Sequence, residues 1–304
     1  MIRRVFVFVL RMLVRLRLTR LPLSMAQAEW WGDYIRKTPG YFDCNDFAIA
    51  KQVGHGLVVR VGVVDHIERH LRIAGTWDTP VEDAVIAWLR PGDTFLDIGA
   101  NIGYFTMVAS RIVGSAGIVV ACEPSKRALG KLLAALVANR CDNVIVLSIA
   151  AGDHDGLAEL GLANEGNIGG SSLVPDAGIA AFERIAVMRV GPLLERQLIR
   201  PALIKIDVEG FELRVLRGLT GILDHRPAII CEVTERYLAR GGQTVGAVFD
   251  HLSALGYAAY ELTPGESGQT RCRPVTADRI SGQCEVVFCV GEPRLVLAQD
   301  EPYG

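Results

Sequence analysis

The sequence has no large net charge, no C-x-x-C cysteine pair and no long apolar run near its start. Each of these absences excludes some classes of protein. Its formal net charge of −2 offers no broad electrostatic attraction for nucleic acid. Its seven cysteines include no C-x-x-C pair. Four of them lie in apolar strand-like runs, where a thiol acts as a small core residue. Reduced thiols and a cytoplasmic location fit this usage best.

Residues 1–24 are too often interrupted by charge to span a bilayer. The longest uncharged run in this segment, Val5 to Leu10, has six residues, whereas a spanning helix needs roughly 20. A signal peptide would need a longer apolar core and a small-residue cleavage site, and neither is evident. Six arginines alternate with apolar residues. Two interpretations stay open: a basic helix lying peripherally on an anionic membrane, or a disordered or mis-started terminus.

The length of 304 residues exceeds the usual domain size of roughly 100 to 150 residues, although single α/β domains often reach it. Half of the residues are hydrophobic, which is enough to cover both faces of a buried sheet with helices. We expect four parts: a basic apolar extension (1–24), a helix and β-hairpin region (25–76), the main α/β domain (77–295) and a C-terminal tail (296–304).

The segment TFLDIGANIGYFT, residues 94–106, predicts a strand that turns directly into a helix. Glycines at such a bend let a ligand lie against bare backbone at a helix N-terminus. The pattern from Asp97 through Gly99 to Gly103 is D-x-G-x-x-x-G. It lacks the second glycine of G-x-G-x-x-G, which faces the pyrophosphate of a dinucleotide. A nucleoside without phosphates is therefore favoured, and a nicotinamide-dependent dehydrogenase is disfavoured.

A second strand-like run, 118–122, ends at Glu123, which lies 123 − 103 = 20 residues beyond Gly103. A carboxylate at the end of the next strand is placed to accept both hydroxyl hydrogens of a ribose. Together with the glycine turn, this residue predicts S-adenosylmethionine as the cofactor.

Four ordered segments resemble the FkbM family of S-adenosylmethionine-dependent methyltransferases. They are TFLDIGANIGYFT, CEP at 122–124, AGDHDG at 151–156 and LIKIDVEGFELRVLRG at 203–218. The likeness runs from about Trp77 to about Thr263. It implies a class I methyltransferase fold and, most often, methylation of a hydroxyl on a sugar, polyketide or other small acceptor.

Strand and helix patterns alternate through the main domain, which predicts a mostly parallel sheet. We expect a Rossmann-like, doubly wound, seven-stranded sheet with an antiparallel C-terminal strand. The expected strands are 94–98, 118–122, 144–149, 203–207, 228–233, 258–262 and 285–290. The expected helices are 79–89, 104–113, 126–139, 211–218 and 245–255. One or two hairpins are expected within 41–73, and 161–201 is expected to be an irregular, mobile flap over the substrate.

The cofactor-binding candidates follow from these motifs. The backbone of Gly99, Ala100 and Gly103 would meet the methionyl part of the cofactor, and the Asn101 amide would donate to its carboxylate. Asp97 would either orient the loop or touch the ligand. The resemblance further implies that Glu123 holds the ribose and that Asp153 accepts from the adenine amine. Asp153 has a plain alternative as a turn residue in the run Gly152 to Gly156.

The catalytic candidates are Lys205, Asp207 and Glu209, whose alternation with apolar residues places them toward one side. A carboxylate pair beside a lysine can tune one member's pKa toward neutral. Plainer readings are that Glu209 caps the next helix and that Lys205 only pairs with Asp207. We expect no metal. The N/D-P-P-Y/F motif of enzymes that methylate nucleic-acid bases is absent here, where Asp207 to Gly210 reads DVEG, so base methylation is disfavoured.

The leading hypothesis is an O-methyltransferase acting on a carbohydrate or small-molecule hydroxyl, so its partner would be a small-molecule or glycan acceptor rather than a nucleic acid. Transfer to nitrogen or carbon of a metabolite or peptide is the enzymatic alternative. A nucleoside-binding subunit without turnover is the third. No pattern indicates an oligomeric state.

Overall fold

The computed structural model describes residues 22–37, 48–164, 166–175, 181–264 and 269–297, and also positions 9, 12, 14, 16 and 179. Most of the basic extension and nearly all of the C-terminal tail lie outside this description, so both stay predictions. Within the described ranges, no helix combines the length and the apolar character that crossing a bilayer requires. The chain divides into two compact units, 1–77 with 163–169 and 78–162 with 170–304.

The second unit contains a nine-stranded sheet. Its strands are β3 (Thr94–Ile98), β4 (Ile118–Cys122), β5 (Val144–Leu147), β9 (Leu203–Ile206), β10 (Ala228–Thr234), β11 (Ala258–Pro264), β12 (Thr270–Pro274), β13 (Gln283–Cys289) and β14 (Val296–Leu297). Their spatial order is β14-β12-β11-β13-β10-β9-β3-β4-β5. The order reverses between β3 and β9, and ligands of open α/β sheets bind at such a switch point.

The expected fold class is confirmed, and the sheet is two strands larger than expected. Neighbours among β5, β4, β3, β9 and β10 pair in parallel. β13 inserts antiparallel between β10 and β11, which is the predicted closing pair. No strand was expected between 258–262 and 285–290, but β12 lies there, because Thr270 to Pro274 pairs with the edge of β11.

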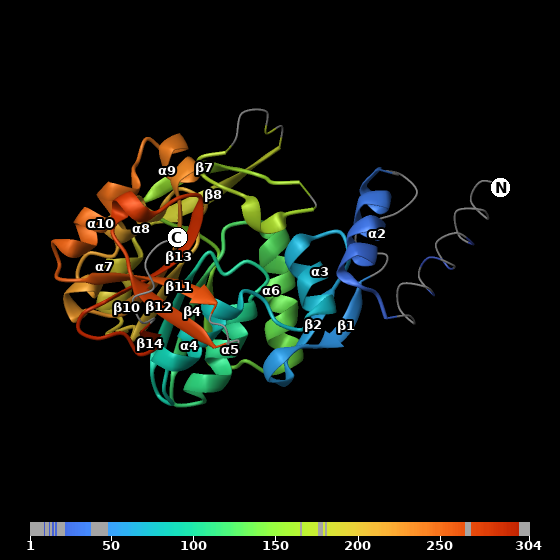
Figure 1. The fold of residues 1–304 in the computed structure, drawn as a ribbon, viewed down its shortest axis with the longest axis horizontal. Coiled ribbons are helices and arrows are strands. Elements are labelled where there is room, and N and C mark those ends of the chain that lie inside the picture. The colour runs from blue at the N-terminus through green and yellow to red at the C-terminus, as the bar shows by residue number, and fades with distance from the viewer. Residues whose placement is uncertain are drawn as a thin grey trace. The chain divides into compact units, whose positions relative to one another are not determined.

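Helices cover both faces of this sheet (Figure 1). They are α4 (Thr79–Trp88), α5 (Tyr104–Val113), α6 (Lys126–Asn139), α7 (Val190–Arg196), α8 (Glu212–Gly218), α9 (Glu235–Arg240) and α10 (Val245–Ser253). Alternate strand residues face opposite sides. Leu96 and Ile206 join an apolar cluster with residues of α7, α8 and α10. Asp97 and Lys205, which are register partners on β3 and β9, therefore lie on the other face.

The region 161–201 is more regular than predicted. A small sheet of β6 (Ala150–Ala151), β7 (Gly156–Gly161) and β8 (Phe182–Met188) includes part of it, and α7 follows. The expectation of an irregular flap is therefore wrong for residues 182–196. The reason is tertiary, since Ile185 and Val187 on β8 pack with Leu160 on β7.

The first unit contains α2 (Met25–Lys37), β1 (Ile49–Gln52), β2 (Val58–Val61) and α3 (His66–Ile73). β1 and β2 form one antiparallel hairpin, as predicted. Within the described residues 48–73 there is one hairpin, in agreement with the expected one or two, and α3 follows it. Asp65 begins this helix by accepting a hydrogen bond from the Glu68 backbone N–H at 3.0 Å, which is a standard N-cap.

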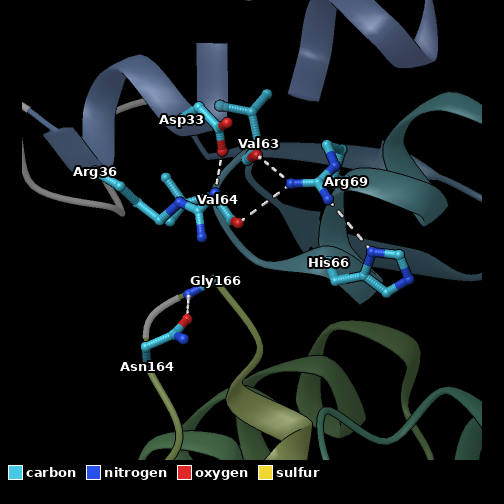
Figure 2. Close-up of polar contacts among 8 residues, drawn as sticks. All are labelled: Asp33, Arg36, Val63, Val64, His66, Arg69, Asn164 and Gly166. Atoms are coloured by element: carbon cyan, nitrogen blue, oxygen red, sulfur yellow. Dashed lines mark hydrogen bonds and ion pairs between the residues drawn. The ribbon is translucent and has the colours of Figure 1, made fainter. Parts of the chain in front are cut away.

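Segment 163–169 belongs to the first unit by its contacts. The second carboxylate oxygen of Asp65 accepts from the Ile168 N–H at 2.9 Å, and the His66 N–H donates to the Gly166 carbonyl at 2.9 Å. Asn164 folds back to accept from the Gly166 N–H at 2.8 Å (Figure 2). These bonds hold the middle of the β7–β8 connection against the start of α3.

Candidate active site

The glycine turn after β3 is built as the sequence predicts. The N–H groups of Gly99 and Ala100 both donate to the Cys122 carbonyl at 3.0 Å, which ties the turn to the end of β4. Gly99 has φ +81°, and a Cβ there would lie 1.8 Å from the Asp207 carbonyl oxygen. Gly103 begins α5 with φ +88°, and a Cβ there would lie 2.3 Å from Leu132. Both glycines are therefore required by conformation and by space.

Glu123 is buried directly beside this turn. One carboxylate oxygen accepts from the Asn101 N–H at 2.7 Å, and the other accepts from the Ser125 N–H at 2.8 Å. Burial raises the pKa of Glu123 to about 7, although these two hydrogen bonds oppose the shift. Each carboxylate oxygen has a further lone pair, so Glu123 can accept ribose hydroxyls while it holds the turn.

Two polar atoms near the turn have no hydrogen-bond donor among the described residues, namely Oδ1 of Asn101 and Oδ1 of Asp97. Asn101 is held in the left-handed region at φ +50°. The other oxygen of Asp97 accepts from the Thr106 hydroxyl at 2.5 Å. Burial raises the pKa of Asp97, against the charge of Lys205. Asp97 thus braces the start of α5, and a direct contact of Asp97 with the ligand stays a prediction.

The Asp153 carboxylate contacts residues outside the glycine turn and Glu123. Its carboxylate contacts His154 Nδ1 at 2.9 Å and an Arg214 guanidinium nitrogen at 3.7 Å. Burial alone would raise its pKa, but these two partners outweigh that effect and lower it. The turn-residue interpretation and the adenine-binding interpretation both fit this geometry, so the adenine contact stays a prediction.

Lys205 and Asp207 form a contact pair at the end of β9. The ammonium lies 3.0 Å from a carboxylate oxygen of Asp207 and 5.3 Å from the centre of the Phe105 ring. Burial disfavours the ammonium, but the charges of Asp207 and Asp97 outweigh burial and raise the pKa of Lys205. Burial likewise acts to raise the pKa of Asp207, and the charge of Lys205 reverses this shift. Asp207 is therefore ionised at neutral pH.

Further acidic groups face this pair from the neighbouring strands. Glu232 and Glu285 are opposite each other on β10 and β13. Burial and the charge of Asp207 raise the pKa of Glu232 well above its usual range, and Glu232 hydrogen-bonds to Asp207. Burial and the charge of Asp78 raise the pKa of Glu285 similarly. Because a protonated carboxyl group can donate a hydrogen bond, we infer that Glu232 keeps its proton and donates a hydrogen bond to the Asp207 carboxylate.

Glu209 completes this cluster from the turn before α8. Burial, then the charges of Asp207 and Glu212, raise the pKa of Glu209 to about 8. Carboxylate oxygens of Asp207, Glu209 and Glu232 lie within 4.8 Å of one another, close enough to hold a metal ion. The expectation of no metal stays a prediction. The structure thus brings Lys205, Asp207 and Glu209 together as expected.

Sequence reasoning missed two residues that support the Glu209 turn. Glu212, 2% exposed, accepts from the Gly210 N–H at 2.9 Å, and Ser172 donates to the Glu209 carbonyl at 2.7 Å. The sequence carried a signal for Glu212, because an acidic side chain in the first turn of a helix is stabilised by the exposed N–H groups there. None existed for Ser172, which is 37 residues away.

The Methyltransferase FkbM domain model matches residues 97–259, more than half of the chain. The chain belongs to this family. It is an S-adenosylmethionine-dependent methyltransferase by family, and the bare Gly99 turn, the Glu123 carboxylate and the unpaired Asn101 oxygen fit that cofactor. No curated protein matches the chain.

Solved structures resemble the chain with low sequence identity and low TM-scores. Precorrin-6y C5,15-methyltransferase from Geobacter metallireducens has 12% identity and a TM-score of 0.39, over 71% of this chain and 88% of its own. A putative rRNA methylase from Clostridium thermocellum has 10% identity and a TM-score of 0.43, over 70% and 96%. Aeropyrum pernix fibrillarin with natively bound S-adenosylmethionine has 13% identity and a TM-score of 0.36, over 69% and 74%. The family assignment therefore rests on the sequence match.

Proposed function

We propose that this methyltransferase transfers the methyl group to a hydroxyl of a carbohydrate or other small polyhydroxylated acceptor. The observation that carries the proposal is the carboxylate cluster of Asp207, Glu209 and Glu232, whose oxygens lie within 4.8 Å of one another. Carboxylates accept hydrogen bonds from hydroxyl groups. Several at one position suit an acceptor that carries more than one hydroxyl.

On this proposal, the Gly99 to Gly103 turn and Asn101 hold the methionyl part of the cofactor, and Glu123 holds its ribose. When bound, S-adenosylmethionine supplies an electrophilic methyl group on a sulfonium. The Gly99 backbone lies against the Asp207 carbonyl, so the cofactor turn and the carboxylate cluster are fixed to each other. Such fixed alignment of reactants supplies several kcal/mol of catalysis, up to roughly 7–11 in ideal cases.

Asp207 and Glu209 have different roles because their proton affinities differ. Asp207 is ionised and held by Lys205 at 3.0 Å, so it orients the acceptor hydroxyl by accepting its hydrogen bond. Glu209, whose pKa is raised to about 8, is the better proton acceptor. A base works only when it is ionised, so turnover should rise with pH through about 8.

Transfer to nitrogen is the second candidate, since a carboxylate cluster also attracts a protonated amine. The product distinguishes the two, because an O-methyl ether and an N-methyl amine differ in mass-spectrometric fragmentation. The protein is incubated with methyl-labelled S-adenosylmethionine and a panel of polyols, glycans, polyketide-type alcohols and primary amines. Labelled ethers support the proposal, and label confined to amines or carbon overturns it.

Asp207→Asn tests the acceptor side directly. The change should leave cofactor affinity within about twofold and lower turnover by roughly 10- to 150-fold, because the hydrogen bond of the acceptor hydroxyl to a charged group contributes about 1.5–3 kcal/mol. Asp155→Asn is the matched control, because Asp155 is an exposed aspartate of the same unit that pairs with Arg189 at 2.9 Å. Calorimetric titration measures cofactor binding, and label incorporation measures turnover. Full activity of Asp207→Asn would exclude Asp207 from the reaction.

A further inference from the structure

The turn that carries Glu209 has a conformation that its residue type does not favour. Glu209 has φ +54°, in the left-handed region. A non-glycine residue there costs roughly 1–2 kcal/mol, so surrounding contacts must hold it. Glu212 holds one side of the peptide group between Glu209 and Gly210, because it accepts a hydrogen bond from the Gly210 N–H at 2.9 Å. The Glu209 carbonyl is the other side of that planar group and needs a donor of its own.

Ser172 makes the contact to that carbonyl. Its hydroxyl donates to the Glu209 carbonyl oxygen at 2.7 Å and accepts from the Val174 N–H at 3.0 Å. Because the Val174 N–H donates to a lone pair of the Ser172 hydroxyl oxygen, the hydroxyl proton is directed to the Glu209 carbonyl oxygen. Ser172 is 3% exposed. Its backbone exchanges two hydrogen bonds with Gly161, at 2.9 and 3.0 Å.

The segment around Ser172 also packs against the turn. A Cβ at Gly210 would lie 2.7 Å from Val174 and 2.5 Å from the Tyr237 carbonyl oxygen. Gly210 itself has φ +105°. The turn is thus enclosed by segment 172–174 and α9, and it has one polar tie to that segment, through Ser172, among the bonds described here.

We propose that Ser172 is a positioning residue that holds the left-handed turn and so sets where the Glu209 carboxylate lies relative to Asp207. The proposal rests on the proposed function, in which Glu209 accepts the proton of the acceptor. Ser172 touches neither acceptor nor cofactor in this role.

Because charged groups surround Glu209, a change in the position of its carboxylate should change its pKa. Asp207 directly after β9, Glu212 on α8 and Glu232 on β10 are acidic. Arg236 and Arg240 on α9 lower the Glu209 pKa. Segment 172–174 carries no titratable side chain. When the Ser172 tie is lost, the turn relaxes, and Glu209 becomes more exposed to solvent and moves away from its acidic neighbours. Its pKa then falls toward the ordinary value.

The test compares kcat and KM across pH in the parent, Ser172→Ala, Glu209→Gln and the double variant. Ser172→Ala should lower kcat about tenfold, move the alkaline-rising limb to lower pH and leave the KM for S-adenosylmethionine unchanged. In the Glu209→Gln background the same change should have no further effect on kcat, because it acts through that carboxylate. An equal tenfold loss in both backgrounds would overturn the proposal.

Ser110→Ala is the matched control, since Ser110 is 5% exposed and donates to Asn143 at 2.5 Å. It should change stability without moving the pH limb. Ser172→Cys, which keeps the volume but donates weakly, should shift the limb in the same direction by less. This variant keeps the test valid if Ser172→Ala does not fold.

A second readout does not require turnover. The folded pKa of Glu209 is raised from 4.5 to about 8, so this carboxyl destabilises the fold increasingly as pH rises across that window. The difference in melting temperature between parent and Glu209→Gln should therefore grow with pH and report the Glu209 pKa. In the Ser172→Ala background, the midpoint of this pH-dependent rise in the melting-temperature difference should lie at a lower pH. An unchanged midpoint overturns the role of Ser172, whereas absent methyl transfer in the parent overturns only the proposed function.

Discussion

Two groups of carboxylates lie at the same edge of one sheet, yet they are held in different ways. The first group lies at the carboxyl ends of β3 and β4, and the second lies at the carboxyl ends of β9 and β10. On the cofactor side, both oxygens of Glu123 accept backbone N–H groups, and Asp97 accepts from a hydroxyl. On the acceptor side, Asp207, Glu209 and Glu232 face one another. Lys205 lies in contact with Asp207, at 3.0 Å.

The difference indicates two kinds of binding site. A carboxylate held by backbone donors keeps its position with or without a ligand, which suits a cofactor of constant shape. Carboxylates that repel one another share protons, and their pKa values move apart. That arrangement suits a site where a proton is transferred. The cofactor side therefore provides position, and the acceptor side provides a tuned proton affinity.

Gly99→Ala should have the largest effect, because it disturbs both sides at once. Its Cβ would lie 1.8 Å from the Asp207 carbonyl in a residue with φ +81°, so we expect a loss of roughly 3 kcal/mol or more in unfolding free energy. Gly130→Ala is the control, since a Cβ there meets nothing within 4 Å in the middle of α6, and it should stabilise by about 0.5–1 kcal/mol. Urea unfolding compares the two. A Gly99→Ala protein as stable as the parent would contradict the described turn.

Lys205→Met should have the next largest effect and should act mainly on the acceptor side. Removing one partner of a fully buried ion pair costs about 3–5 kcal/mol, but the Asp207 side chain is 36% exposed, so we expect a smaller loss of about 2–3 kcal/mol. The loss should be smaller at pH 5 than at pH 8, since carboxyl groups without Lys205 become protonated as pH falls. Thermal unfolding across pH measures this, with the exposed Lys126→Met as control. Equal losses at both pH values would argue against the carboxylate cluster as the cause.

Glu123→Gln should have the smallest effect of the three and should act on the cofactor side alone. Loss of charge-assisted hydrogen bonds should weaken S-adenosylmethionine binding by about 1–3 kcal/mol, roughly 5- to 150-fold in Kd. The pKa of Glu123 is about 7, and the ionised form accepts more hydrogen bonds. The parent's affinity should therefore rise between pH 6 and 8, whereas that of the variant stays flat. Calorimetry at each pH, with the exposed Glu159→Gln as control, tests this.

The cofactor side could be predicted in detail because its signals are local. The strand 94–98, the helix 104–113 and the strand 118–122 have the predicted bounds, since glycines and buried apolar runs mark each end. Gly99 was recognised from its motif alone. Its second requirement, the close approach to the Asp207 carbonyl, depends on the pairing of β3 with β9 and was not visible in the sequence.

The acceptor side could be predicted only in outline. The alternation of Lys205 and Asp207 indicated a shared side, but the raised pKa values of Glu232 and Glu285 depend on how β10 pairs with β13. The support from Ser172 joins segments far apart in the chain. By contrast, α3 was missed although its signal is local, since Asp65 and Glu68 have the spacing of a helix start.

A crystal structure with S-adenosylhomocysteine tests the central claim most directly. The account predicts a nucleoside beyond the ends of β3 and β4, with its ribose hydroxyls on Glu123 and its amino-acid part against the Gly99 to Gly103 turn. The sulfur should face the Asp207 carboxylate. A nucleoside bound elsewhere, or a crevice at Glu123 filled by side chains of the protein, would contradict it.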